Sequence, residues 1–375
     1  MTLTETLGYL LTIQKFITIP NFTENFYQKK WITILRILPI LIFVFTAICD
    51  GIYAILYVNI PQLGEVSALA EFVIGVNLIS DRLSITFILV QGVIVNGLHI
   101  RLLKSVKEFE DNLVSSKHPK KQKKCLSSNI YLILNIILNL AINSGFYVIN
   151  NSDYDIAATI RHHLHVLGML LSDFVILYLI NFIKHISVLA ILLLGQKNLN
   201  ETETNKLFQN SFAFISRISL MNSTLGGMLL ITFFQYILSS SLAVYFVVWL
   251  IFGTGYFPGK IFLILTCLIW ILRSSIHIIY LSILGNNFEN KIQKLSRLLS
   301  TRNPTENESS EVVEFNRNQF LMWSFHAETR ILAGGYMAIN NSGIFSILSF
   351  IVTCLVVLLQ FKQMEDYSRL DNKIF

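Results

Sequence analysis

The sequence predicts an all-α membrane protein that crosses a bilayer seven times. Three observations carry this prediction. First, 53% of the 375 residues are hydrophobic and only 14% are charged, whereas about a quarter of the residues in soluble domains are charged. Second, the apolar residues gather in runs of about twenty or more, the length at which a helix spans the hydrocarbon core. Third, the basic residues behind the net charge of +6 lie between these runs, which favours a membrane topology over a nucleic-acid partner.

Seven apolar segments have the length of a membrane-spanning helix. In order, they are Trp31–Val58, Ala68–Ile100, Ile130–Ile149, Leu164–Leu194, Gly226–Phe252, Ile261–Leu284 and Ser342–Phe361. The fourth has 31 residues, and as a helix it would measure about 46 Å against a hydrocarbon core of about 30 Å. Tilt takes up part of such an excess, so we expect the rest of the helix to project into the cytoplasm.

Two connections carry apolar residues at helical spacing and predict further helical extensions in the cytoplasm. One follows the fourth span, over residues 192–222, and the other covers residues 289–325, with a polar break at Pro304. We expect these extensions to pack on one another. The alternative interpretation is that both are solvated linkers with local helix.

Lys and Arg residues are distributed asymmetrically between the two sides of the predicted membrane. The N-terminal segment holds three, and the connections after spans two, four and six hold eight, four and six, whereas the opposite connections together hold only Lys260. Because basic connections stay in the cytoplasm, the N-terminus is predicted to be cytoplasmic and the C-terminus extracellular. Rhodopsin-like receptors have the opposite orientation, and the chain lacks an Asp-Arg-Tyr triplet after its third span. A G-protein-coupled receptor is therefore disfavoured.

The sequence lacks the motifs of catalytic, cofactor and metal sites. It contains no P-loop, no glycine fingerprint for a dinucleotide, no GxSxG and no HExxH. Its four cysteines have no CxxC spacing and read as small buried hydrophobes. The RHHLH run at 161–165 has no carboxylate or cysteine nearby to complete a zinc site, so we interpret it as interfacial or as part of a ligand site. We expect no enzyme activity, no cofactor and no metal.

Polar and aromatic residues gather in the outer halves of several spans, where they could line a small-molecule cavity open to the outside. Ionisable side chains at membrane depth are costly and are often functional. The predicted spans place Asp173 in the outer half, and Arg273 and His277 in the inner half. The structural alternative is that Trp and Tyr form interfacial belts and that Asn joins helices. The candidate ligand-binding residues are Glu71, Asn139, Asn143, His165, Asp173, Tyr245, Trp249 and Trp270.

Polar residues of the last span share one face of the predicted helix, which we call the polar seam. At about 100° per residue, the five members fall within a sector about 60° wide, with Val357 at its edge and Phe361 beside it. The other faces are uniformly apolar. Such an alignment suits either close helix packing through small residues or a water-facing seam in an oligomeric pore. The members of the seam are Ser342, Ser346, Ser349, Thr353 and Gln360.

The end of the chain resembles the C-terminal signature of the insect gustatory receptor family, which reads Thr-Tyr, five hydrophobic residues, then Gln-Phe. Here the signature begins at Thr353, runs through the five residues 355–359 and ends in Gln360-Phe361. The preceding stretch ILAGGYMAINNSGIFSILSFIV is similar to the segment that leads into this signature in the family. One departure is that Cys354 replaces the usual tyrosine. It lies off the polar seam, so we expect altered packing more than a lost pore.

The resemblance implies a taste receptor that acts as a tetrameric, ligand-gated, non-selective cation channel in the plasma membrane of sensory neurons. The four last spans would surround the pore, lined by Thr353, Val357, Gln360 and Phe361. A short helix around Leu332–Ile339 would belong to the anchor that holds the subunits together. The implied partners are a small-molecule tastant, permeant cations, the lipid bilayer, and identical or related subunits.

On this interpretation the chain has three parts. Residues 1–284 form the N-terminal segment and helices one to six with an outward-facing ligand cleft; residues 285–341 form the cytoplasmic loop and anchor helix; and residues 342–375 form the last helix and an extracellular tail. Cys354 and the lack of a carboxylate-rich sugar pocket favour a bitter-type receptor. The alternatives are a sugar-type receptor of the same family and, in a different class, a seven-helix transporter or metabotropic receptor.

Overall fold

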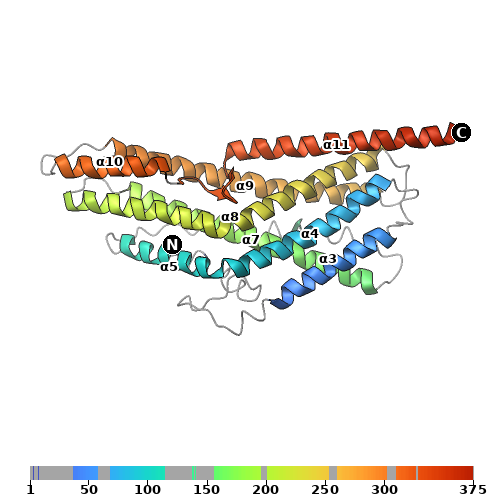
Figure 1. Cartoon of the computed structure of the whole chain (residues 1–375), viewed down its shortest axis with the longest axis horizontal. Coiled ribbons are helices and arrows are strands. Elements are labelled where there is room, and N and C mark those ends of the chain that lie inside the picture. Colours follow the sequence, from blue (N-terminus) through green and yellow to red (C-terminus); the bar gives the residue numbers. More distant parts are fainter. Residues whose placement is uncertain are drawn as a thin grey trace.

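Long helices make up nearly all of the part of the chain that the structure describes (Figure 1). The computed structural model describes residues 3, 7, 37–57, 68–114, 137–138, 140, 156–195, 201–252, 260–301, 310–326 and 328–374. Its helices are α3 (Ile37–Tyr57), α4 (Ala68–Ile94), α5 (Asn96–Val114), α7 (Ile156–Leu194), α8 (Glu201–Phe252), α9 (Lys260–Ser300), α10 (Ser310–His326) and α11 (Asn341–Ile374). Two short strands, β1 (Leu332–Ala333) and β2 (Met337–Ala338), precede α11. The predicted helical membrane fold is confirmed.

The described helices coincide with all of the expected spans except the third. Four of them are long and apolar enough to cross a membrane, and α4 with α5 makes a fifth if the bent pair is one span. A shorter apolar helix covers Ile37–Cys49 within α3. The expected third span, 130–149, lies almost wholly outside the described residues. The count of seven and the orientation therefore stay predictions.

The second expected span is not one straight helix. It bends by 65° between α4 and α5, around Val95. Backbone hydrogen bonds continue through the bend, since Val95 N donates to Gln91 O at 2.9 Å and His99 N donates to Val95 O at 2.9 Å. After the bend, one face of α5 is fully buried, with Leu102 and Val106 at 0% exposure. The bend therefore turns the helix so that α5 packs against the rest of the bundle.

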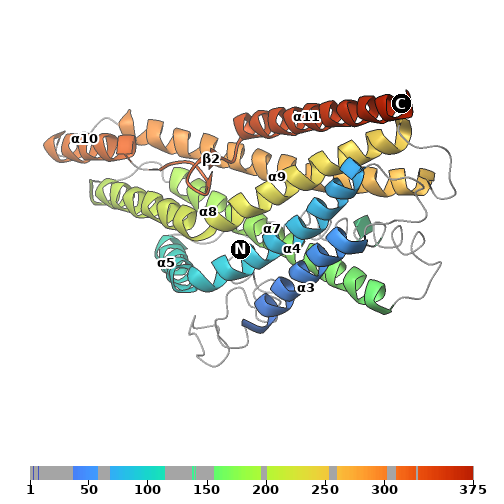
Figure 2. The same cartoon turned by 45° about the vertical axis from the view of Figure 1, so that its right-hand side comes forward.

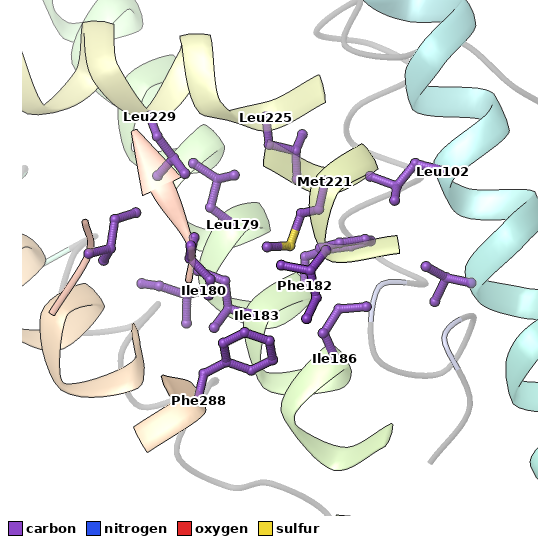
Figure 3. Close-up of a cluster of buried hydrophobic side chains, with 14 of the residues drawn as sticks. Leu102, Leu179, Ile180, Phe182, Ile183, Ile186, Met221, Leu225, Leu229 and Phe288 are labelled. Atoms are coloured by element: carbon purple, nitrogen blue, oxygen red, sulfur yellow. The ribbon is translucent and has the colours of Figure 1, made fainter. Parts of the chain in front are cut away.

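The helices extend far beyond their apolar stretches, as the sequence predicts. α8 has 52 residues and α9 has 41, and α9 runs without a break through the expected boundary at 284/285. Their extensions share a core with α5 and α7, in which apolar side chains from all four helices meet (Figure 3). Burying each such side chain contributes about 1.5–3 kcal/mol where the alternative is water. The labelled members are Leu102, Leu179, Ile180, Phe182, Ile183, Ile186, Met221, Leu225, Leu229 and Phe288.

A β-hairpin occupies the segment that was expected to form a short anchor helix. Strands β1 and β2 pair antiparallel, with Leu332 opposite Ala338. Between them, Gly334 and Gly335 have φ values of 62° and 79°, which residues with a Cβ rarely adopt. The expectation of a helix over Leu332–Ile339 was wrong, because two consecutive left-handed residues end any right-handed helix and reverse the chain.

The last helix, α11, lies along one long edge of the bundle, while α3 lies on the opposite side (Figures 1 and 2). It packs on α8 and α9, yet only 6% of the residues in its apolar stretch are buried within the chain. It continues to Ile374, well past the expected end at Phe361, so the expected tail is an extension of the same helix. An apolar helix left this bare needs lipid or further subunits to cover it.

Candidate functional site: a buried polar cluster and the last helix

An ion pair joins α7 to α9 in the middle of the bundle. Arg273 donates from Nε to Asp173 Oδ2 at 3.2 Å and makes a second, closer contact with Oδ1. Tyr236 of α8 donates to the same carboxylate at 3.4 Å. Asp173 and Arg273 are only 3% and 2% exposed. The assignment of these two residues to opposite halves of the membrane was therefore wrong, because they lie at the same depth and form a fork-shaped pair.

A second buried carboxylate links α4 to the same place. Gln235 of α8 donates to Asp81 Oδ1 at 3.3 Å and accepts from Ser172 Oγ at 3.2 Å. Ser172 precedes Asp173 in α7, so the hydrogen bonds form a continuous path from α4 through α8 to α7. We call the connected set the polar cluster. Its members are Asp81, Ser172, Asp173, Gln235, Tyr236, Arg273 and His277.

An aromatic stack closes the cluster on one side. The rings of Tyr236 and His277 lie almost parallel, with centroids 5.2 Å apart and an interplanar angle of 12°. His277 is fully buried, and its Nε2 lies 3.8 Å from Asp173 Oδ1. The cluster thus combines a paired charge, amide and hydroxyl groups and a flat aromatic surface. Small-molecule sites place a few such polar groups among apolar and aromatic side chains.

Two buried hydroxyl groups beside the cluster have no hydrogen-bond partner within the described part of the chain. They belong to Ser239 of α8 and Ser274 of α9, which are 3% and 0% exposed. Because α8 and α9 run antiparallel and Tyr236 stacks on His277, the residues one turn away, Ser239 and Ser274, fall at the same level. Buried hydroxyls are normally bonded. A further polar group at this level would therefore find two hydroxyls to bond.

Two of the three predicted aromatic residues lie in a separate cluster near the start of α9 and the end of α8. Tyr245 and Trp249 are 1% and 4% exposed and pack with Val73 of α4 and Leu263 of α9. Leu355 and Leu358 of α11 pack against the same group. We call this group, completed by Leu242 and Leu250, the aromatic cluster. It connects α4, α8 and α9 directly to the last helix.

The structure brings together only some of the predicted ligand residues. Asp173 belongs to the polar cluster, Tyr245 and Trp249 belong to the aromatic cluster, and Trp270 is buried in α9 one turn before Ser274. The side chains of Glu71, Asn139, Asn143 and His165 lie outside the described residues.

Sequence reasoning missed the uncharged members of the polar cluster. Two of these members, Gln235 and Tyr236, come from the stretch FFQYILSSS of α8, which also contains Ser239 beside the cluster. A glutamine followed by three serines inside an otherwise apolar span is costly in lipid unless it meets polar partners. That signal was available in the sequence.

The polar seam of α11 lies opposite the face with which α11 packs on its own chain. All five seam residues are exposed. The packing residues Ile347, Ile351, Leu355 and Leu358 lie about 180° around the helix from the seam. Val357 and Phe361, beside the seam, are 42% and 55% exposed. Within one chain, the seam therefore faces away from the other helices.

A bundle of long apolar helices with buried polar residues at its centre and a bare last helix defines a polytopic helical membrane protein. The chain belongs to the 7tm chemosensory receptor family, whose sequence model matches residues 7–365. This is a family of receptors, and it confirms the relationship that the C-terminal signature indicated.

Two further comparisons show which known proteins the chain is similar to. A stretch of 49 residues is 47% identical to gustatory and pheromone receptor 32a of Drosophila melanogaster. It covers 13% of this chain and 11% of that receptor, so the match spans only a small part of either protein. The olfactory receptor OR5 of Machilis hrabei has a similar fold, both with eugenol bound (TM-score 0.63) and in a second structure (TM-score 0.62). In each case the identity is 12%, and the alignment covers 96% of this chain and 98% of the receptor.

Proposed function

We propose that the chain is a gustatory receptor of the bitter type: a tetrameric, non-selective cation channel that opens when a small-molecule tastant binds. The observation that carries the proposal is the polar seam of α11, which lies on the face turned away from the chain's own helices. Four copies around an axis would turn these seams towards one another and enclose a polar path. A helix that served only as a membrane anchor would face lipid on this side, where aligned polar side chains are not stabilised.

The proposed pore is lined by Thr353, Val357, Gln360 and Phe361. The Thr353 hydroxyl donates a hydrogen bond to Ser349 O of the same helix, at 2.8 Å, so the lone pairs of its oxygen stay available to water or ions. Gln360 and Phe361 come last on the way out and form the proposed constriction. On the predicted orientation, with the N-terminus in the cytoplasm, this end of α11 is extracellular. The site of action is the plasma membrane of sensory neurons, and the four subunits are identical or related.

The proposed tastant site lies between α4, α7, α8 and α9, at the level of Ser239 and Ser274. A ligand there would touch the polar cluster on one side and Trp270 on the other. Its effect can reach the pore through the aromatic cluster, because Tyr245 and Trp249 pack in the same group as Leu355 of α11. A ligand shifts a channel towards opening only if it binds the open state more tightly. The division into parts 1–284, 285–341 and 342–375 follows these roles.

Whole-cell recording in a heterologous cell tests the channel proposal. We expect one or more of quinine, denatonium, salicin and sucrose to evoke a rapid cation current that persists when GDP-β-S in the pipette blocks G proteins. A response to sucrose alone would indicate the sugar type. Loss of the current with GDP-β-S would indicate a metabotropic receptor, and uptake of the compound without channel current would indicate a transporter.

Replacing Gln360 by alanine should change unitary conductance or the permeability ratio of Na⁺, K⁺ and Ca²⁺, because a side chain at a constriction replaces part of the ion's hydration shell. Gln319→Ala, at an exposed position of α10, is the matched control and should leave both quantities unchanged. If Gln360→Ala behaves like Gln319→Ala, the pore assignment is wrong.

Chemical cross-linking tests the assembly without any ligand. In a background with the native cysteines replaced by alanine, Thr353→Cys should give covalent dimers with a short bis-maleimide, because the seams face one another across the axis. Ile351→Cys, on the opposite face of the same helix, should stay monomeric on a denaturing gel. Equal cross-linking at the two positions would rule out the arrangement.

A further inference from the structure

The hairpin before α11 is fastened to α8 by one asparagine. Asn222 donates from Nδ2 to the carbonyl of Arg330 at 2.8 Å and to Glu328 Oε2 at 2.9 Å. Its side-chain oxygen accepts from the backbone N of Leu332 at 3.1 Å. The Asn222 side chain therefore makes three hydrogen bonds to the segment that leads into β1.

The tip of the hairpin rests on the same stripe of α8. Gly226, one turn after Asn222, accepts at its carbonyl from Gly334 N at 2.7 Å. A Cβ at Gly226 would lie 3.0 Å from Leu332 O, and a Cβ at Gly334 would lie 2.5 Å from the side chain of Leu230. At Gly226 the hairpin backbone therefore lies directly on the α8 backbone, and at Gly334 it lies against the side chain of Leu230.

The end of the hairpin is fastened to α9 in a similar way. Gly285 touches the backbone of Ile339 so closely that a Cβ there would lie 1.7 Å from the Ile339 carbonyl oxygen. One turn later, Glu289 accepts from Asn340 Nδ2 at 2.9 Å, and its other oxygen lies 2.9 Å from Arg330 Nε. The carboxylate therefore joins the beginning and the end of the hairpin to α9.

Asn340 also caps the first turn of α11. Its side-chain oxygen accepts from Gly343 N at 3.1 Å, and its carbonyl accepts from Ile344 N at 3.3 Å. This is the geometry of an N-cap, which satisfies a backbone donor that the helix itself leaves open. The oxygen of the Asn340 amide therefore bonds the start of α11, while its nitrogen bonds a carboxylate of α9.

We propose that Glu289 and Asn340 form a joint that sets the position of the pore helix relative to α8 and α9, and through it the balance between closed and open channels. The proposal rests on the channel function proposed above. Most other contacts of α11 with its own chain are made by apolar side chains such as Ile347, Ile351 and Leu358, and such contacts have no fixed direction. Hydrogen bonds to a carboxylate are directional and stronger, so the joint transmits a movement of α9 to α11.

A reciprocal swap of side chains tests the joint. Asn340→Asp keeps a capping oxygen for Gly343 but sets a second carboxylate against Glu289. Asn340→Asp combined with Glu289→Gln restores one amide and one carboxylate with their places exchanged. Glu314→Gln, in an exposed pair with Arg317 on α10, is the matched control for the loss of a glutamate charge.

Single-channel recording of purified protein in planar bilayers, with no tastant present, provides the gating measurement. A coupling of ordinary size changes an equilibrium about fivefold or more. We expect Asn340→Asp to change the unliganded open fraction by at least that factor with unitary conductance unchanged, and the swap to bring it back towards wild type. An unchanged open fraction in Asn340→Asp, or a swap that recovers nothing, would overturn the proposal.

Thermal unfolding of wild type, Asn340→Asp, Glu289→Gln and the double variant in nanodiscs tests the contact independently of the channel function. The contact predicts that the shifts in Tm of Asn340→Asp and Glu289→Gln are not additive in the double variant; additive shifts would overturn the joint. A wild type that shows no unitary current, either without a tastant or with any of the four test compounds above, would reject the channel function and the gating role with it, independently of the result of the unfolding cycle.

Discussion

We expect Asp173→Asn to lower the amount of folded receptor at the cell surface to a small fraction of the wild-type amount. The change keeps the size of the side chain but leaves Arg273, which is 2% exposed, without its bidentate carboxylate partner. Breaking a buried ion pair by removing one partner costs about 3–5 kcal/mol, a large fraction of the stability of an ordinary protein. Surface biotinylation and the Tm of detergent-purified protein measure the loss.

The double variant Asp173→Asn, Arg273→Gln tests whether the single variant loses surface expression because Arg273 keeps its charge without a carboxylate partner or because the packing around residue 173 changes. With both charges gone, Gln and Asn can bond each other, and the desolvation cost of an isolated guanidinium no longer arises. We expect the double variant to recover much of the surface level that the single variant loses. Glu314→Gln, which breaks a pair 60% exposed on the glutamate side, should cost at most about 1 kcal/mol. A double variant no better than the single would show that the charge of Arg273 is not the cause.

The sequence predicted the ionisable members of the polar cluster but not their pairing. Ionisable residues inside apolar runs are visible in any sequence, and Asp173, Arg273 and His277 were identified in this way. Pairing depends on the depth of each helix in the bundle, which was counted from predicted span ends. α7 begins at Ile156, about two turns before the predicted start at Leu164. Asp173 therefore lies near the middle of its helix, level with Arg273.

The hairpin was mispredicted although its turn has a local signal. Two consecutive glycines in AGGYMA, between apolar residues, are typical of a tight turn with positive φ. The contacts that hold the hairpin could not be predicted, because Asn222 and Glu289 lie 110 and 51 residues away in sequence from Leu332 and Asn340, their respective partners. Contacts of this separation follow from packing and not from a local pattern.

The polar seam was predictable from sequence alone, because the faces of a straight helix depend only on residue spacing. The structure adds that the opposite face is the packing face, which spacing cannot reveal. The ligand residues Glu71, Asn139, Asn143 and His165 stay predictions, as does the role of Gln360 and Phe361.

Gly285→Ala should disconnect the pore helix from α9. The added Cβ would lie 1.7 Å from Ile339 O, whereas the Cβ of Gly97→Ala, in α5, would have nothing within 4 Å. Because the obstructing atom belongs to the backbone, no rotation of a side chain relieves the contact. The end of the hairpin must move away, and the bond between Glu289 and Asn340 must lengthen with it. Overpacking costs about 1–3 kcal/mol and sometimes more, and we expect the upper end here.

Gly97→Ala is a sharp control because it makes the same chemical change in another helix. Removing a glycine from a helix favours folding by up to about 1 kcal/mol, so the Tm of Gly97→Ala should stay or rise while that of Gly285→Ala falls. If the joint sets gating, the Gly285→Ala channels that do fold should resemble Asn340→Asp in their unliganded open fraction. A lowered Tm with wild-type gating would mean that Gly285 is needed only for packing. The hairpin would then stabilise α11 without affecting the balance between closed and open channels.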